Sequence, residues 1–385
     1  MEKIPYSKQS VDSSDVNSVI DVLNDSFITQ GPKVNEFERK FAKYCDAKYA
    51  VAVSNGTSAL TIANKALGLQ KNDKVITTPN TFVATANSIA LNEALPYLVD
   101  INSDDFNISV KKINHALNSN SNFKGVIPVH FAGVLADIES ISLLAKKFDV
   151  YVLEDACHAL GGTWVDSNGV KHKVGDCSYS DMTVFSFHPV KQITTGEGGM
   201  ITTNSESHYH QLLSLRSHGI CKPDRTDHMK LQPWYYEMTN LSGNHRITDI
   251  QCALGISQLK KNKRWCKKRS EIVGRYESAF SDLSMVSSQS HSNSGNTSFH
   301  LYVIKAKDRD NLYRFLHEKG IAVQVHYIPV HFHPYYQKQF GYKKGDFQNC
   351  ENYYGKALSL PLYPTLKDSE QDFVISSIKD FYNER

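Results

Sequence analysis

Short apolar runs alternate with helical patterns through the first half of the chain, and this alternation limits the possible folds more than any other feature. Each run has the length of a strand and is bounded by polar or turn residues. The runs are Lys74 to Thr77, Tyr97 to Val99, Gly125 to Val129, Val150 to Leu153 and Thr183 to Phe187, with crossover helices expected at Ala86 to Asn92 and Asp137 to Phe148. Strands separated by helices form a mainly parallel sheet covered on both faces, so we predict an α/β fold.

The pattern changes near residue 250, which indicates a second domain. A long helical pattern runs from Thr248 to about Leu283. It is followed by a low-complexity segment at 287–296, a strand at Ser298 to Ala306, a helix at Asp308 to Lys319 and an extended segment at Val323 to Ile328. Because 385 residues exceed what one core usually serves, we predict a large domain, 1–249, and a smaller α+β domain, 250–385.

Composition limits the compartment and the partners. No window reaches the length of a transmembrane span, and the N-terminus lacks the apolar region of a signal peptide, so we expect a cytoplasmic protein. Seven dispersed cysteines without a C-x-x-C pair indicate reduced thiols. The basic run Lys260 to Arg269 could indicate nucleic-acid binding. Because the whole chain has a net charge of only +3, we interpret the run as a solvated helix face. His326, His331 and His333 have no carboxylate or thiol at ligand spacing, so no metal site is predicted.

Lys191 directly follows the apolar run Thr183 to Phe187, on a turn that Pro189 prevents from continuing the strand. An ε-amine held beside a packed sheet is partly desolvated, which lowers its pKa and lets it form a Schiff base with an aldehyde. The glycine-rich run Thr194 to Gly199 then turns the backbone into the next apolar segment. A solvated surface lysine is the alternative that this segment alone favours.

Two further segments change that balance. Tyr49 to Val53 is a strand-like run followed by Ser54-Asn-Gly-Thr-Ser58 and a helical pattern, and the start of such a helix is a site for a phosphate, although it is also an ordinary N-cap. The apolar run Val150 to Leu153 ends in Glu154-Asp155, and strand ends in open α/β sheets face one crevice. Asp155 could therefore keep a pyridine nitrogen protonated there, or only cap the following helix.

A phosphate cradle, a strand-end aspartate and a strand-end lysine are the parts that a pyridoxal phosphate site requires. With these parts in place, the chain resembles the nucleotide-sugar aminotransferase family of fold-type I pyridoxal phosphate enzymes. The similarity extends nearly from end to end. It lies in Thr29 to Pro32, Asn55 to Ser58, Thr81 to Asn87, Pro128 to Gly133, Glu154 to His158, the Lys191 segment, Asn244 to Asp249 and Ser359 to Pro364. The sequence departs from relatives at Gln192, where proline is frequent, and at Ser242-Gly243, where an aromatic residue is common.

The resemblance implies a role for each site residue. Lys191 would bind the cofactor and move the proton, Asp155 would pair with the ring nitrogen, and His158 would lie near the ring. The cofactor contacts implied besides these are Gly56, Thr57, Phe82, Ser186 and, from a neighbouring subunit, Asn244. The implied substrate contacts are Tyr6, Ser26, Phe27, Ile28, Thr29, Gln324, Val325, His326 and Tyr327. A homodimer with shared active sites follows from the role of Asn244.

The arginine content helps to define the substrate. Transaminases for two α-amino acids usually clamp a carboxylate with a fork-shaped arginine, but the only arginine after Arg314 is Arg385. This favours a second substrate with hydroxyls and an aromatic base. Within the family, Ser186 to Gly199 and Gln324 to Tyr327 most resemble members that transfer an amino group from L-glutamate to C4 of a UDP-linked 4-keto-6-deoxy-N-acetylhexosamine. That step belongs to pseudaminic acid biosynthesis.

Two alternatives stay open at this point. The first is C4 amination of another 4-keto sugar nucleotide, the D-gluco isomer or a GDP-sugar, because the sequence does not fix which face of C4 receives the proton. The second is a sugar dehydratase or a binding protein on the same fold. Lys191 speaks against the dehydratase, because relatives with that activity lack this lysine.

Overall fold

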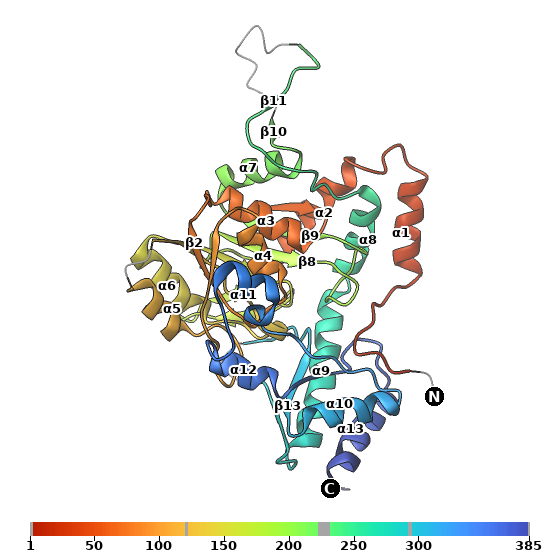
Figure 1. Ribbon diagram of the computed structural model, residues 1–385. Helices are drawn as coiled ribbons and strands as arrows, with labels where there is room; N and C mark the ends of the chain where they lie inside the picture. Colours follow the sequence, from red (N-terminus) through yellow and green to blue (C-terminus); the bar gives the residue numbers. More distant parts are fainter. Residues whose placement is uncertain (1–2, 120–121, 222–231, 292–294, 384–385) are drawn as a thin grey trace.

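A mixed, mainly parallel sheet forms the centre of the protein, as predicted (Figure 1). The computed structural model describes residues 3–119, 122–221, 232–291 and 295–383. Within these residues, seven strands pair in the order β1-β9-β8-β5-β4-β2-β3. Their bounds are β1 Tyr49–Val53, β2 Lys74–Thr77, β3 Leu95–Leu98, β4 Phe123–Val126, β5 Tyr151–Asp155, β8 Met182–Ser186 and β9 Gly199–Thr203. Each predicted strand is present, with ends shifted by a few residues.

Successive side chains of a strand point to opposite faces of the sheet and pack against two different layers of helices. Val51 and Val53 pack in a core with α3, α4 and α7, whereas Ala50 and Ala52 face a core that includes α2 and α8. A third cluster packs α5 and α6 on strands β2, β4 and β5. The helices are α2 Pro32–Cys45, α3 Gly56–Ala66, α4 Ala84–Ala90, α5 Val110–Leu117, α6 Ile138–Phe148, α7 Glu206–Arg216 and α8 Asp249–Leu259. A sheet buried on both faces accounts for the nearly continuous apolar runs.

Strand β9 is antiparallel to both of its neighbours, β1 and β8. Gly199, its first residue, is opposite Val53 and Ser186, the last residues of those strands. A side chain at this position would not fit, because a Cβ on Gly199 would lie 2.6 Å from the carbonyl oxygen of Asn55. The strand after the lysine segment therefore closes against the turn that begins α3.

A smaller sheet lies in the C-terminal part of the chain. It pairs β12 Val286–Ser288, β13 Tyr302–Ala306 and β14 Ala357–Leu360, all antiparallel. Its helices are α9 Asn262–Phe280, α10 Arg309–Glu318, α11 Pro334–Phe340, α12 Gln348–Tyr354 and α13 Asp368–Asn383. Helices α9, α10 and α13 share one apolar core with this sheet (Figure 1). These elements form an α+β arrangement, and the division of the chain at residue 249 stays a proposal.

Three expectations need correction. The helical stretch from 248 to 283 is two helices, α8 and α9, because the chain bends where Asn262 is buried and donates to the hydroxyl of Tyr44. The basic run is not wholly solvated, since Arg269 is buried and donates to three backbone carbonyls. Residues 298–301 lie outside β13, although Ser298 to Ala306 was expected to be one strand.

Several elements had no counterpart in the sequence pattern. They are α1 Ser13–Leu23, α2, α5, α7, α11, α12 and α13, and the strands β6 Thr163–Val165, β7 Lys171–Lys173, β10 Ile220–Cys221, β11 Glu237–Met238, β12 and β14. Strands β10 and β11 pair in a hairpin that projects from the body of the protein (Figure 1). None of the helices in the described ranges is both long enough and apolar enough to cross a membrane.

Candidate active site

A cavity of about 840 Å³ opens at the carboxyl ends of β5 and β8, beside the first turn of α3. This is the crevice where open α/β sheets bind their ligands. The cavity brings together the predicted residues Tyr6, Gly56, Thr57, Phe82, Asp155, His158, Ser186, Lys191, His326 and Tyr327. They come from segments that are far apart in the chain, so the fold assembles what the motifs only suggested.

The first turn of α3 forms one end of the cavity. Asn55 is the N-cap, and its side chain accepts a hydrogen bond from the backbone N–H of Ser58. The N–H groups of Gly56 and Thr57 have no intrahelical partner at this position, and the helix dipole is positive here. A Cβ on Gly56 would lie 3.0 Å from Cβ of Ser186. The backbone thus approaches β8 closely and leaves a small, amide-lined hollow suited to an anion.

Asp155 ends strand β5 and is 5% exposed. One of its carboxylate oxygens accepts a hydrogen bond of 2.7 Å from the hydroxyl of Thr85, and the other accepts one of 3.2 Å from the backbone N–H of Cys157. These two donors fix the orientation of the carboxylate. The arrangement suits a charge partner for a positively charged group in the cavity.

Lys191 lies in the loop between β8 and β9. Its backbone N–H donates to the carbonyl of His188, which makes the tight turn expected after Pro189. Burial lowers the pKa of the Lys191 amine, which increases the neutral fraction near neutral pH. Its Nζ lies 3.5 Å from Nε2 of His300.

Neutral histidines line the other end of the cavity. Burial lowers the pKa of His158 and His300 well below the usual value, and lowers that of His326 to about 3. Nδ1 of His158 accepts a hydrogen bond from the backbone N–H of Ala132, so the ring proton is on Nε2. Nε2 lies 3.1 Å from the hydroxyl oxygen of Tyr327, which therefore accepts that proton's hydrogen bond and can donate its own.

The remaining predicted residues do not line this cavity. They are Ser26, Phe27, Ile28, Thr29, Asn244, Gln324 and Val325. The segment 26–29 and Asn244 are exposed. The carbonyl of Ile28 accepts a hydrogen bond from the backbone N–H of Asp249. Gln324 is exposed and exchanges backbone hydrogen bonds with Ser359, while Val325 packs against the C-terminal core.

Sequence reasoning missed several lining residues, and His300 is the clearest case. Its ring centroid is 4.4 Å from that of His158, and it is 2% exposed. No local signal could have found it, since His300 falls inside a segment that reads as an ordinary strand. Cys157, His188, Glu197 and His245 also line the cavity, and only their closeness to motif residues could have suggested them.

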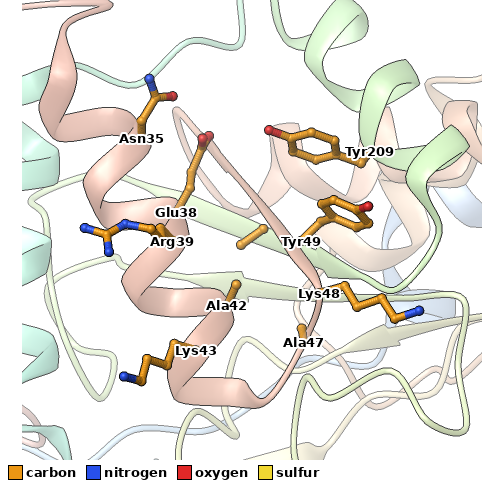
Figure 2. Close-up of a pocket in the computed structure, with 10 residues that line it drawn as sticks. Asn35, Glu38, Arg39, Ala42, Lys43, Ala47, Lys48, Tyr49 and Tyr209 are labelled. Atoms are coloured by element: carbon orange, nitrogen blue, oxygen red, sulfur yellow. The ribbon is translucent and has the colours of Figure 1, made fainter.

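A separate surface hollow, away from the cavity described above, lies beside α2, β1 and α7 (Figure 2). Its volume is about 610 Å³. Its cations, Arg39, Lys43 and Lys48, are exposed. Its buried carboxylate, Glu38, accepts hydrogen bonds from Arg216 and from the backbone N–H of Ala52. Burial raises the pKa of Glu38. Because its carboxylate is already bonded by Arg216 and by the N–H of Ala52, we interpret this hollow as a feature of the surface and not as a ligand site.

The described residues contain no group of three or more histidine, cysteine or acidic side chains that could hold a metal ion. Among the described residues, the site offers backbone amides, hydroxyls, the carboxylates of Asp155 and Glu197, the amine of Lys191 and neutral rings. Such a set can hold an organic anion and move protons.

Comparison with known proteins identifies relatives over the whole length of the chain. The model of the DegT/DnrJ/EryC1/StrS aminotransferase family matches residues 9–379. A spore coat polysaccharide biosynthesis protein, SpsC, of Bacillus subtilis is 38% identical over 98% of this chain and 96% of its own. The UDP-4-amino-4,6-dideoxy-N-acetyl-beta-L-altrosamine transaminase of Campylobacter jejuni is 37% identical over 96% of this chain and 95% of its own.

Solved structures agree with this finding. Helicobacter pylori PseC, an aminotransferase involved in the biosynthesis of pseudoaminic acid, superposes with a TM-score of 0.91 and 30% identity, covering 100% of both chains. The protein Spr1654 of Streptococcus pneumoniae, in its pyridoxal phosphate form, gives a TM-score of 0.89 and 28% identity over 99% of both chains. The predicted fold class is confirmed by these matches.

Proposed function

Because the chain belongs to the DegT/DnrJ/EryC1/StrS aminotransferase family, we propose that it transfers an amino group from L-glutamate to C4 of a UDP-linked 4-keto-6-deoxy-N-acetylhexosamine. The chain is an aminotransferase, and pyridoxal phosphate is its cofactor. The product would be UDP-4-amino-4,6-dideoxy-N-acetyl-β-L-altrosamine, with 2-oxoglutarate, on the route to pseudaminic acid. The observation that carries the proposal is one cavity lined by Lys191, Asp155 and the first turn of α3.

The residues of this cavity fit the cofactor. The hollow at Gly56, which a Cβ would fill, would hold the phosphate on the N–H groups of the first turn of α3, with Ser186 and Thr57 beside it. Phe82, whose side chain is 56% exposed, would cover the ring. When bound, pyridoxal phosphate supplies an aldehyde that exchanges amino groups and a ring that withdraws electrons.

Lys191 and Asp155 would divide the chemical work. The amine of Lys191, whose pKa is lowered by burial, would accept the proton from Cα of glutamate at Nζ. In the second half of the reaction the same amine would return a proton to C4 of the sugar. Asp155, oriented by Thr85 and the N–H of Cys157, would stabilise positive charge at the ring nitrogen.

The substrate assignment draws on the relative from Campylobacter jejuni and on the aromatic lining of the pocket. The rings of Tyr6 and His326 lie with centroids 5.5 Å apart in the cavity. Tyr327 can donate its hydroxyl proton into the cavity, because its oxygen accepts from His158. Rings and a hydroxyl donor are suitable partners for a sugar that carries an aromatic base.

The direct test is to incubate the protein with pyridoxal phosphate, glutamate and the UDP-linked β-L-arabino 4-keto sugar, and to identify the product by NMR. We expect the 4-amino sugar of L-altro configuration and one 2-oxoglutarate for each amine transferred. An absorbance band that shifts when glutamate is added is the matching signal for the donor half. Turnover of the D-gluco isomer or a GDP-linked 4-keto sugar alone would overturn the substrate, and a silent spectrum would contradict transamination at this site.

We also propose that the active protein is a two-fold dimer with shared sites. Five of the predicted residues that do not line their own cavity, Asn244 and those at 26–29, are exposed. The hairpin region, which precedes Asn244 in the chain, exposes Trp234, Tyr236, Met238 and Leu241, each at least 60% accessible. Exposed apolar clusters of this kind mark interaction surfaces, and an isologous dimer would bring both loops to the partner's site.

Mixing two inactive variants tests this dimer. Lys191→Ala and Asn244→Ala proteins should each be impaired alone. Refolded together in equal amounts, half of the dimers are mixed and each has one intact site of two, so activity should recover to about a quarter of wild type. Mixed dimers that are verified by mass spectrometry and show no recovery would place Asn244 outside the partner's site.

A further inference from the structure

His300 contacts the amine of Lys191, although it belongs to no motif of the sequence. Its Nε2 is 3.5 Å from Nζ of Lys191, and its ring is almost completely buried. Its Nδ1 is buried too, without a partner among the described residues. Buried imidazole nitrogens normally have a hydrogen-bond partner. Within the described part of the chain, the polar contact of this ring is the one that Nε2 makes with the Lys191 amine.

The backbone around His300 is held on two sides. Its N–H donates to the carbonyl of Ala132, at 2.8 Å, in the segment between β4 and α6. Its carbonyl accepts from the guanidinium of Arg269, which also donates to the carbonyls of Phe299 and Leu362. Arg269 is 1% exposed and donates to carbonyls rather than to a carboxylate. A buried cation in this position fixes the peptide units that carry the imidazole.

Gln192, the residue after Lys191, ties the lysine loop to the same segment. Its side-chain amide donates to the hydroxyl of Ser298, at 3.1 Å, and to the carbonyl of His158. Ser298 also donates to that carbonyl, at 3.2 Å. A proline at position 192 could make neither bond. The lysine and the histidine are therefore linked twice, once through their side chains and once through their neighbours.

The other groups around the amine come from different elements. Asp155 and Cys157 face it from the end of β5, His158 from the segment after β5, and His326 from the C-terminal part of the chain. Their electrostatic effects on Lys191 and the histidines are mutual, so several groups influence the charge of the amine. The hydrogen-bonding contact with His300 restricts its position.

We propose that His300 is a positioning residue, which holds the Lys191 amine through Nε2 whenever that amine is free and so keeps Nζ aimed into the cavity. This proposal rests on the proposed function, in which the Lys191 amine is free during both proton transfers, and the amine is also free in the protein without cofactor. A neutral amine can donate to or accept from a neutral imidazole, so the contact survives in either tautomer. Its value lies in orientation, because misplacing a reacting group slows its reaction strongly.

The test measures how fast Lys191 captures the cofactor. Protein stripped of cofactor is mixed with pyridoxal phosphate, and fluorescence quenching reports binding while absorbance reports covalent attachment. For His300→Phe we expect binding affinity close to wild type and attachment slower by about 10- to 100-fold. His300→Gln, which places an amide near the position of Nε2, should recover most of the rate. Borohydride reduction and peptide mapping identify the attached lysine in every protein.

A second buried histidine provides the matched control. His331 is fully buried, bonds Glu351 and does not line the cavity, so His331→Phe reports what a lost buried histidine does to the fold alone. Its attachment rate should equal wild type. Equal slowing in His331→Phe, or a wild-type rate in His300→Phe, would overturn the positioning role. Attachment to a different lysine in the wild type would instead contradict the proposed function.

Discussion

The two ends of the cavity are built in different ways. The phosphate end consists of residues 55–58 and Ser186, which belong to a strand–turn–helix unit and to a strand beside it. The histidine end consists of His158, His300, His326 and Tyr327. Its contacts join residues far apart in the chain, with 109 positions between Lys191 and His300 and 169 between His158 and Tyr327.

This difference matches two kinds of chemistry. The phosphate end offers backbone amides and a helix dipole, which are fixed by secondary structure and do not titrate. The histidine end offers neutral rings whose pKa values are lowered by burial. Substitutions at the first end should therefore act on affinity for the cofactor, while those at the second end should act on rate. Lys191 and Asp155 lie between the ends and should show the largest effects.

The largest effect is expected for Lys191→Ala, which removes the group that both ends serve. Turnover with glutamate should fall by about 10⁴-fold, the upper range for a positioned proton-transfer group, while the cofactor still binds noncovalently. Steady-state rates and dialysis of the cofactor measure the two parts. Lys173→Ala, which removes a lysine paired with Asp46 away from the cavity, should keep its activity. If Lys191→Ala lost cofactor binding along with turnover, affinity and rate would not be controlled by separate ends of the cavity.

Asp155→Asn should be next, with a rate at least ~100-fold lower. The substitution keeps the shape and removes the negative charge that would face the ring nitrogen. Asp181→Asn is the matched control, because Asp181 accepts from the N–H of Val152 near the opposite end of β5. Comparison of the two rates separates charge in the cavity from support of the strand. Near-normal turnover of Asp155→Asn would contradict a role for its charge in the reaction and would leave Asp155 with only a structural, capping role.

Gly56→Ala probes the phosphate end alone. The added Cβ would lie 3.0 Å from Cβ of Ser186 and 3.4 Å from Sγ of Cys157. Overpacking of about 1–3 kcal/mol should raise the cofactor Kd by about 10- to 100-fold, with the rate at saturation less affected. Fluorescence titration measures the Kd. Gly274→Ala meets no heavy atom within 4 Å and should bind the cofactor normally. A lower rate with an unchanged cofactor Kd in Gly56→Ala would contradict the proposal that the phosphate end controls affinity.

Tyr327→Phe should give the smallest effect, at the histidine end. It removes one hydroxyl, which bonds Nε2 of His158 and can donate into the cavity. A net hydrogen bond of about 0.5–1.5 kcal/mol corresponds to a rate about 2- to 10-fold lower. Cofactor affinity should not change. Tyr44→Phe, which removes a hydroxyl bonded to Asn262 outside the cavity, is the control for stability. A changed cofactor Kd in Tyr327→Phe would show that the ends are not independent.

The same comparison explains what could be predicted from the sequence. The strands of the large sheet were predicted because burial on both faces makes them continuous apolar runs. Gly56, Asp155 and Lys191 were found because each follows such a run directly. Helices α2 and α13 were missed because charged residues are interleaved with their apolar ones. Part of the packing of each is on a helix distant in the chain, α8 for α2 and α10 for α13.

His300 could not be predicted because its role depends on tertiary contacts alone. Residues 298–301 read as the start of a strand, yet they leave the sheet to bond Ala132 and Arg269. In the same way, Arg269 reads as part of a solvated basic run and is instead buried under that segment. A charge pattern in one sequence gives no information about which member of the run turns inward.

The single reversed strand, β9, has a consequence for chain entropy. Since Ser186 and Gly199 are paired, the loop that carries Lys191 is short and is closed within one hairpin, with Phe187 donating to the carbonyl of Gly198. Closing a short loop costs less conformational entropy than joining distant segments, and the cost grows with the logarithm of loop length. The lysine loop is therefore retained by the sheet itself. Partial loss of order in the C-terminal part would release the amine from His300 without opening the loop on which it is carried.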